Sequence, residues 1–140
     1  MPETTDWKMP ELSTNLYVRD VEKSAEFYTN VMGFKLGQTQ RDEEGKLVLA
    51  EIRRGSGAFA IVDVRTVPSD AAYLKEHRKG PLGRGVVLGV TATNLDATYA
   101  SFKGKKGLRV LCKPEDTGMG MRVMDVRDLN GFTWSFIEQR

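Results

Sequence analysis

The chain has 140 residues, of which 40% are hydrophobic and 29% are charged, and its formal net charge is +2. This composition is typical of one globular domain with a sizeable core, and the net charge is too small to indicate nucleic-acid binding. No apolar run reaches the roughly 18 residues of a membrane-spanning helix, and the first residues lack the basic and apolar regions of a signal peptide. The single cysteine, Cys112, excludes an internal disulfide and favours a cytoplasmic location. We therefore expect neither nucleic acid nor membrane as a partner.

The first half of the chain predicts a strand, a helix and three further strands. Leu16 and Val18 alternate with their neighbours in the period-2 pattern of a half-buried strand. Asp20 can cap the helix that follows, and Gly33 can end it in a left-handed conformation. Residues 1–11 are polar and contain two prolines, so we expect them to form an arm. The predicted elements are a strand over 13–19, a helix over 21–32, and strands from 34, over 47–53 and over 58–64, with a hairpin turn at 41–46.

A less regular stretch, residues 66–85, separates this half from the second. Ser69 can cap a short helix over 70–77, and the glycines at 80, 83 and 85 predict a flexible linker. The elements predicted after it are a strand over 86–92, a helix over 95–104, and strands over 108–113, 121–127 and 132–138, with a loop over 114–120 and a turn at 128–131.

The two halves repeat one pattern at a constant spacing of 74 residues. The matched pairs are Asp20 and Asn94, Val21 and Leu95, Tyr28 and Phe102, Gly33 and Gly107, Phe34 and Leu108, and Leu36 and Val110. Matches of residue class at one spacing favour two copies of one supersecondary unit over two unrelated strand–helix units. We therefore predict a single α+β domain made of two repeats, residues 12–65 and 86–138, joined by the linker.

Three motifs resemble those of the vicinal oxygen chelate superfamily, which includes glyoxalase I, extradiol dioxygenases, fosfomycin resistance enzymes and bleomycin resistance proteins. They are LYVRDVEKSAEFYTNVMGF in the first copy, NLDATYASFKGKKGLRV in the second, and VRDLNGFTWSFIE at the end, where Leu129 replaces the family's usual proline. The resemblance spans residues 12–138 and implies duplicated βαβββ modules that form a curled mixed sheet around a cleft. It also implies a homodimer, because most members form dimers. It does not identify one activity, because this fold supports several chemistries.

The resemblance also implies where a metal would bind. In the metal-using members, four strand positions supply His, Glu or Gln ligands to one divalent ion, and carried over by spacing these are Ser13, Asp63, Val87 and Ser135. Only Asp63 is a good ligand, since valine cannot bind a metal and neutral serines bind divalent ions poorly. The only histidine, His77, falls in the linker. We therefore expect neither a metal nor another cofactor.

Alternation along the strands predicts which side chains line the cleft. The candidates are Ser13, Asn15, Tyr17, Glu51, Asp63, Val87, Met121, Val123, Asp125, Thr133 and Ser135. On the strand over 121–127 this assignment requires Arg122 to face the helices, which is unusual for a charged residue. The carboxylates of Glu51, Asp63 and Asp125 favour a cationic or hydrogen-bond-donating ligand. In the alternative interpretation, Glu51 and Asp125 are solvated or paired with the arginines two positions along each strand, and Asp63 is a satisfied buried acid.

Two other features carry little chemistry. Cys112 has no histidine near it in the sequence, so nothing indicates a reactive thiol. The basic cluster from Lys103 to Lys106, with Arg109, follows the second helix and is expected to be a solvated end. The GKKG turn within it lacks a phosphate-binding pattern.

Two functional hypotheses follow from these observations. In the first, the chain is a metal-free small-molecule-binding protein, most like the bleomycin resistance members, which sequesters a ligand at a cleft made by two chains. In the second, it is a lyase-, isomerase- or dioxygenase-like enzyme in which Asp63, with Glu51 or Asp125, acts as a general base or as an oxygen-rich metal pair. A third alternative is a structural or regulatory subunit that keeps only the fold and the dimer interface.

Overall fold

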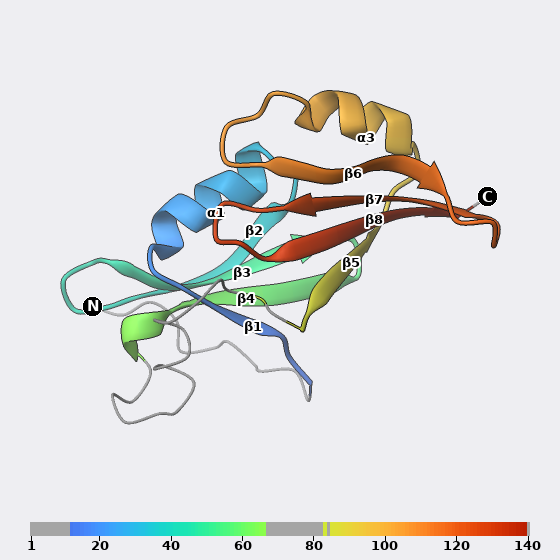
Figure 1. Cartoon of the computed structure of the whole chain (residues 1–140). Helices are drawn as coiled ribbons and strands as arrows, with labels where there is room; N and C mark the ends of the chain where they lie inside the picture. The colour runs from blue at the N-terminus through green and yellow to red at the C-terminus, as the bar shows by residue number, and fades with distance from the viewer. Residues whose placement is uncertain (1–11, 67–82, 84, 140) are drawn as a thin grey trace. The chain divides into compact units, whose positions relative to one another are not determined.

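The computed structural model describes residues 12–66, 83 and 85–139 (Figure 1). The chain divides into two compact units, Met1–Arg78 and Lys79–Arg140, and the described part of each contains one four-stranded sheet and one α-helix. The predicted arm, the predicted helix over 70–77 and His77 lie outside the described residues. Within the described ranges, no helix is both long and apolar enough to cross a membrane.

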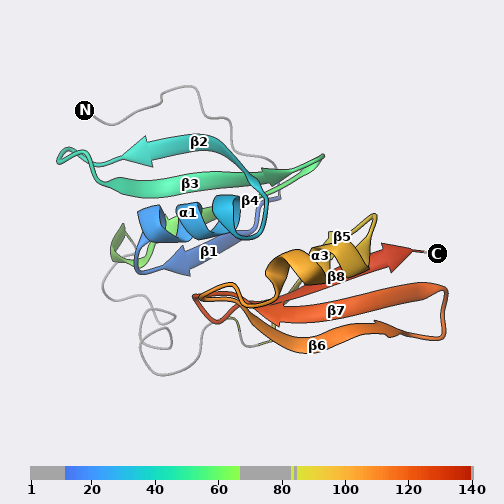
Figure 2. The same cartoon turned by 90° about the horizontal axis from the view of Figure 1, so that it is seen from above.

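The first unit is a mixed sheet with one helix on one of its faces (Figures 1 and 2). Its strand order is β1-β4-β3-β2, with β1 parallel to β4 and the other pairs antiparallel. The helix α1 packs on β2, β3 and β4. The elements are β1 (Asn15–Val18), α1 (Val21–Asn30), β2 (Lys35–Arg41), β3 (Leu47–Arg54), β4 (Gly57–Asp63) and a short 3-10 helix, η1 (Val64–Thr66).

The ends of α1 follow from the sequence signals at each side. The Asp20 side chain accepts a hydrogen bond from the Lys23 N–H at 3.0 Å, as an N-cap residue does. At the other end Gly33 has φ 78°, and the Phe34 N–H donates to the Tyr28 carbonyl at 3.0 Å. The helix ends at Asn30, two residues before its predicted end, because the following residues already form the turn that leads to Gly33.

The second unit repeats this arrangement. Its strand order is β5-β8-β7-β6, with β5 parallel to β8, and α3 packs on β6, β7 and β8. Asn94 caps α3 by accepting from the Ala97 N–H at 3.0 Å, as Asp20 caps α1. The elements are β5 (Val87–Thr91), α3 (Leu95–Phe102), β6 (Arg109–Asp116), β7 (Met121–Arg127) and β8 (Thr133–Gln139). The predicted α+β fold with two βαβββ modules is confirmed.

The edge strand β6 is longer than the sequence predicted. We expected a loop from Pro114, but β6 continues to Asp116, and its pairing with β7 is irregular on both sides of Cys112. Proline lacks an N–H and is tolerated on an edge strand or at a bulge, and β6 is the edge of its sheet. Pro114 therefore marks an irregular edge strand here and not the end of the strand.

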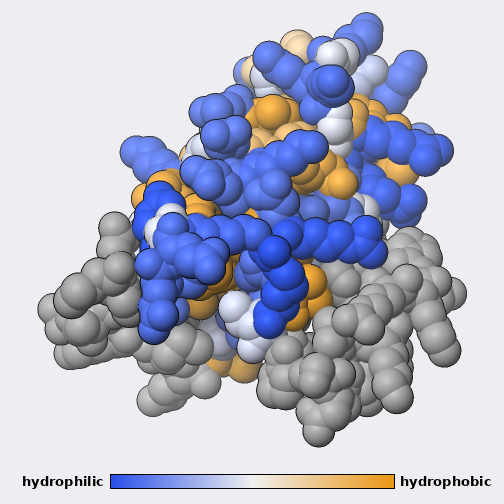
Figure 3. All heavy atoms as spheres, turned by 90° about the vertical axis from the view of Figure 1, so that its left-hand side faces the viewer, coloured by the Kyte–Doolittle hydropathy of each residue, from blue (hydrophilic) through white to orange (hydrophobic). Residues whose placement is uncertain are grey.

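Each unit has its own apolar core between helix and sheet. In the first unit, Val18, Tyr28, Ile52 and Ile61 are fully buried, and the Tyr28 and Phe59 rings meet edge to face at 5.4 Å. In the second, the fully buried residues include Leu95, Met124, Val126 and Phe136. Outside these cores, hydrophilic side chains predominate on the face drawn in Figure 3, with apolar ones visible between them.

Candidate functional site

The two faces of each sheet differ in what covers them. One face packs on α1 or α3 and carries the fully buried side chains; we call the other the open face. In the second unit, Trp134 and Phe136 lie under α3, whereas Thr133 and Ser135, which alternate with them, are only half-buried. The open face is therefore a surface on which side chains remain accessible to a ligand.

Most of the predicted cleft residues lie on an open face. In the first unit these are Asn15, Tyr17 and Glu51, and Ser13 is exposed just before β1. In the second unit they are Val87, Met121, Val123, Asp125, Thr133 and Ser135. Each unit thus presents an open face of its own.

Arg122 faces α3, as the alternation of β7 requires. Its guanidinium forms two hydrogen bonds of 3.0 Å to the Asp96 carboxylate on α3, and one of its nitrogens lies 3.8 Å from the Glu138 carboxylate. These acids explain how a charged side chain is accommodated on the helix side of the sheet. The predicted orientation of β7 is therefore confirmed.

Asp63 does not lie on the open face, and this placement corrects the sequence prediction. It pairs with Val18 across parallel strands, so both side chains are on the face that α1 covers. Asp63 is 1% exposed, and its carboxylate accepts from the Arg65 backbone N–H at 2.8 Å and from the Arg65 guanidinium. Burial alone raises the pKa of Asp63, but the hydrogen bonds and charge of Arg65 outweigh it and leave the pKa below its usual value. The alternative interpretation, a satisfied buried acid, is confirmed.

The register identifies a different residue at the second of the four metal positions. On the open face of the second sheet, Ser135 lies between Gly89 on β5 and Asp125 on β7. The 74-residue equivalents of these neighbours flank Ala60 on β4, so Ala60, and not Asp63, corresponds to Ser135. Asp63 lies three residues after Ala60, an odd number of positions along β4, so its side chain is on the other face of the sheet.

The four positions therefore hold Ser13, Ala60, Val87 and Ser135. Two of these side chains have no donor atom and two are neutral hydroxyls, so the set does not fit a divalent metal ion. Elsewhere in the described residues, no group of three or more His, Cys, Asp or Glu side chains is placed to hold a metal.

Glu51 forms an ion pair with an arginine on its own strand. Its carboxylate lies 2.8 Å from the Arg53 guanidinium and accepts from the Gln38 N–H at 3.2 Å, and its side chain is 14% exposed. The carboxylate lies over Gly37, where an added Cβ atom would clash with the Glu51 Oε1. Sequence reasoning predicted the ion pair as an alternative but missed Gly37, whose signal was a glycine inside a strand.

Asp125, the equivalent of Glu51 in the second unit, is in a different environment. The position equivalent to Gly37 is Leu111, and the Asp125 carboxylate makes no hydrogen bond or ion pair with any residue that the structure describes. Its cross-strand neighbours are Ser135 and Cys112. Asp125 is thus a half-buried carboxylate that remains available to a ligand.

The thiol beside Asp125 is not an activated nucleophile. Burial, the 3.5 Å hydrogen bond from the Cys112 Sγ to the Glu115 carboxylate, and the charges of Glu115 and Asp125 all raise the pKa of Cys112. A thiol with a raised pKa carries little thiolate near neutral pH, so Cys112 serves as a neutral wall of this surface.

The turn before β8 holds the middle of the open face in place. The Asp128 carboxylate accepts from the Asn130 N–H at 2.8 Å, the Phe132 N–H at 3.0 Å and the Trp134 Nε1–H at 2.9 Å. These bonds fix the start of β8, which carries Thr133 on its open face. The motif predicted the turn, but the contact with a buried indole was visible only in the structure.

Comparison with known proteins gives a consistent picture. A family model described as the glyoxalase/bleomycin resistance protein/dioxygenase superfamily matches residues 12–136. A lactoylglutathione lyase from Pseudomonas putida is 42% identical over 94 residues, which cover 65% of this chain and 49% of the relative. The matched segment thus spans about half the length of that curated relative.

Two solved structures show the same fold. TioX from Micromonospora sp. ML1 superposes with a TM-score of 0.68 at 19% identity, covering 94% of this chain and 97% of TioX. A glyoxalase/bleomycin resistance protein/dioxygenase from Nocardioides superposes with a TM-score of 0.66 at 20% identity, covering 96% of this chain and 86% of that protein.

Proposed function

Because the chain belongs to the glyoxalase/bleomycin resistance protein/dioxygenase superfamily, we propose that it binds a small organic molecule on its open faces without a divalent metal and releases it unchanged. The observation that carries this proposal is the donor set at the four family metal positions, Ser13, Ala60, Val87 and Ser135. Sequestration of a drug, as in bleomycin resistance members, and assembly as a dimer are parts of the same proposal.

The open face of the second sheet suggests what kind of ligand binds. Val87 is 62% exposed and offers apolar surface, and Thr133 and Ser135 offer hydroxyl groups. Asp125 provides one carboxylate without a partner among the described residues. A ligand with an apolar body and an ammonium or other hydrogen-bond-donating group complements this surface, since a hydrogen bond to a charged group is worth more than a neutral one.

Thermal-shift measurements on the whole chain test this proposal. A panel of aryl and alkyl amines is compared with the corresponding neutral alcohols, for the wild type, Asp125→Asn, and the control Glu26→Gln, which removes an exposed carboxylate from α1. We expect some amines to raise the melting temperature of the wild type and of Glu26→Gln, and the shift to be lost in Asp125→Asn. Mass spectrometry of the released compound should show it unchanged. Equal shifts for amines and alcohols, or shifts that persist in Asp125→Asn, would contradict the assignment.

A second candidate function rests on the 42% identity to the lactoylglutathione lyase over 94 residues. In that case the chain is an enzyme, and Asp125 is the best-placed general base, because Glu51 and Asp63 are both held by arginines. The test is turnover of lactoylglutathione with added Ni²⁺ or Zn²⁺ and with a chelator. Turnover that is lost in Asp125→Asn would support this candidate over sequestration.

A further inference from the structure

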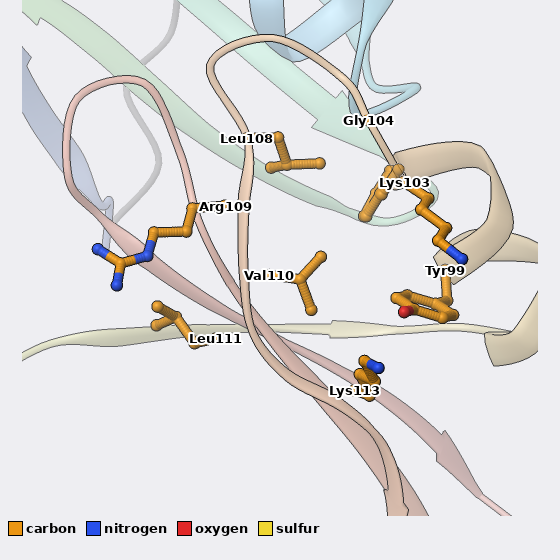
Figure 4. A pocket seen from close by; sticks show the side chains of 9 residues that line it. Tyr99, Lys103, Gly104, Leu108, Arg109, Val110, Leu111 and Lys113 are labelled. Carbon is orange, nitrogen blue, oxygen red and sulfur yellow. The ribbon is translucent and has the colours of Figure 1, made fainter.

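A groove of about 470 Å³ lies in the second unit between the C-terminal end of α3 and the first half of β6 (Figure 4). Its floor is apolar and includes Phe102, Leu108 and Val110. Phe102 is 3% exposed, and its ring packs edge to face on Phe136 at 5.2 Å, so the floor is part of the core and does not depend on mobile surface groups.

The groove is on the opposite side of the sheet from the open face. Val110 pairs with the buried Val126, so its side chain faces α3. Figure 4 shows Leu108, Val110, Tyr99 and the lysines gathered on this side, whereas Arg109 points the other way. The groove is therefore a site separate from the surface around Asp125.

Basic side chains border this apolar floor. Lys103 and Lys113 line the groove, and the Lys103 ammonium lies 6.0 Å from the centre of the Tyr99 ring. None of the nine lining residues is acidic, and neither lysine forms an ion pair with a described residue. Lys105 and Lys106 in the next turn add to the positive potential. The basic cluster is exposed, as expected of a solvated helix end, and its first member, Lys103, also borders the apolar groove.

We propose that this groove binds an organic anion with an aromatic or alkyl body, such as an aryl carboxylate. The apolar body covers Phe102, Leu108 and Val110, and the carboxylate lies between Lys103 and Lys113. Apolar surface without charge would not distinguish an acid from an alcohol, but two unpaired ammonium groups and no competing carboxylate favour the acid.

NMR chemical-shift mapping of the ¹⁵N-labelled whole chain tests the proposal with naphthalene-2-carboxylate as the probe. The comparison compounds are the neutral naphthalene-2-methanol and the cationic naphthalene-2-methylamine. Lys103→Gln/Lys113→Gln is compared with Lys105→Gln/Lys106→Gln, which removes the same charge just outside the lining. We expect the carboxylate to shift the amides of residues 99–113, and to bind the rim variant about fivefold more weakly.

The control variant and the comparison compounds distinguish a specific site from a general effect of net charge. The control variant should bind within about twofold of the wild type, and the alcohol should bind more weakly than the acid. Equal weakening in both variants would show that net charge alone attracts the probe and would overturn the proposal. Carboxylate-induced shifts confined to the open face around Asp125, or equal affinity for the alcohol and the acid, would also overturn it. Shifts around Asp125 that occur with the amine alone would support the proposed function of the open face and would not concern the groove.

Discussion

Replacing Asp128 with asparagine should destabilise the second unit strongly. Asparagine keeps one oxygen acceptor but replaces the other with an NH₂ donor. Either the buried Trp134 Nε1–H or the backbone N–H groups of Asn130 and Phe132 then lose their acceptor. Losing a hydrogen bond to a charged acceptor costs about 1.5–3 kcal/mol, and an unsatisfied buried donor costs about 1–3 kcal/mol. Because these two costs describe partly the same event, we expect a total of about 3 kcal/mol.

The matched control is Asp42→Asn in the hairpin turn of the first unit. There the carboxylate accepts from the Glu44 and Lys46 N–H groups, both at 2.9 Å, but these hydrogen bonds are exposed to solvent. Asparagine retains that acceptor, so the cost should be below about 0.5 kcal/mol. Urea unfolding of the whole chain, followed by far-UV circular dichroism, gives the free energies of unfolding. If Asp128→Asn costs no more than Asp42→Asn, the Asp128 carboxylate does not hold the Trp134 indole as described.

Three further predictions concern titratable side chains whose neighbours hold them in one protonation state or one position. Gly37→Ala should displace the Glu51 carboxylate and lower the urea midpoint of unfolding. In a Glu51→Gln background the same change should have a smaller effect. If the two effects are additive in this double-mutant cycle, the Glu51 carboxylate does not lie against Gly37 as described. Asp63 has a lowered pKa in the folded state, so its contribution to stability is complete above its unfolded value of 3.8 and is lost as the pH falls through the lower folded value. The stability gap between wild type and Asp63→Asn should therefore be larger at about pH 6 than at about pH 2, and a gap that grows on acidification would show the sign to be wrong. Glu115→Gln should speed the reaction of Cys112 with a disulfide reagent near neutral pH, since it removes a negative charge that raises the thiol pKa and leaves only a neutral acceptor for the thiol. An unchanged rate would show that Glu115 does not control the thiol.

The elements were predictable because their signals are local. Leu16 and Val18 alternate along β1, and Asp20 and Asn94 cap helices at equivalent places. The 74-residue spacing then predicted the duplicated topology, since a repeated pattern of strand, cap and helix requires a repeated fold.

The candidate site was harder to predict, because it depends on register. We expected Asp63 on the open face, but the observed pairing places Ala60, three residues earlier on β4, at that position. A one-residue slip in a strand moves a side chain to the other face of the sheet, so counting from a motif cannot replace the observed pairing. The difference between Glu51 and Asp125 depends on a glycine across the strand pair, which no periodicity reveals.

Metal-free binding is tested most directly by the metal content of tag-free protein purified without chelators, together with titration of Ni²⁺ and Zn²⁺ followed by thermal shift. The fourfold variant Ser13→His, Ala60→Glu, Val87→His, Ser135→Glu is the positive control, since it places family-type ligands at the four positions. We predict far less than one metal ion per wild-type chain and no change in melting temperature on addition of either metal, with a gain in the variant. Near-stoichiometric metal in the wild type, with a melting temperature that falls on chelation, would contradict the proposed metal-free binding and support the enzyme.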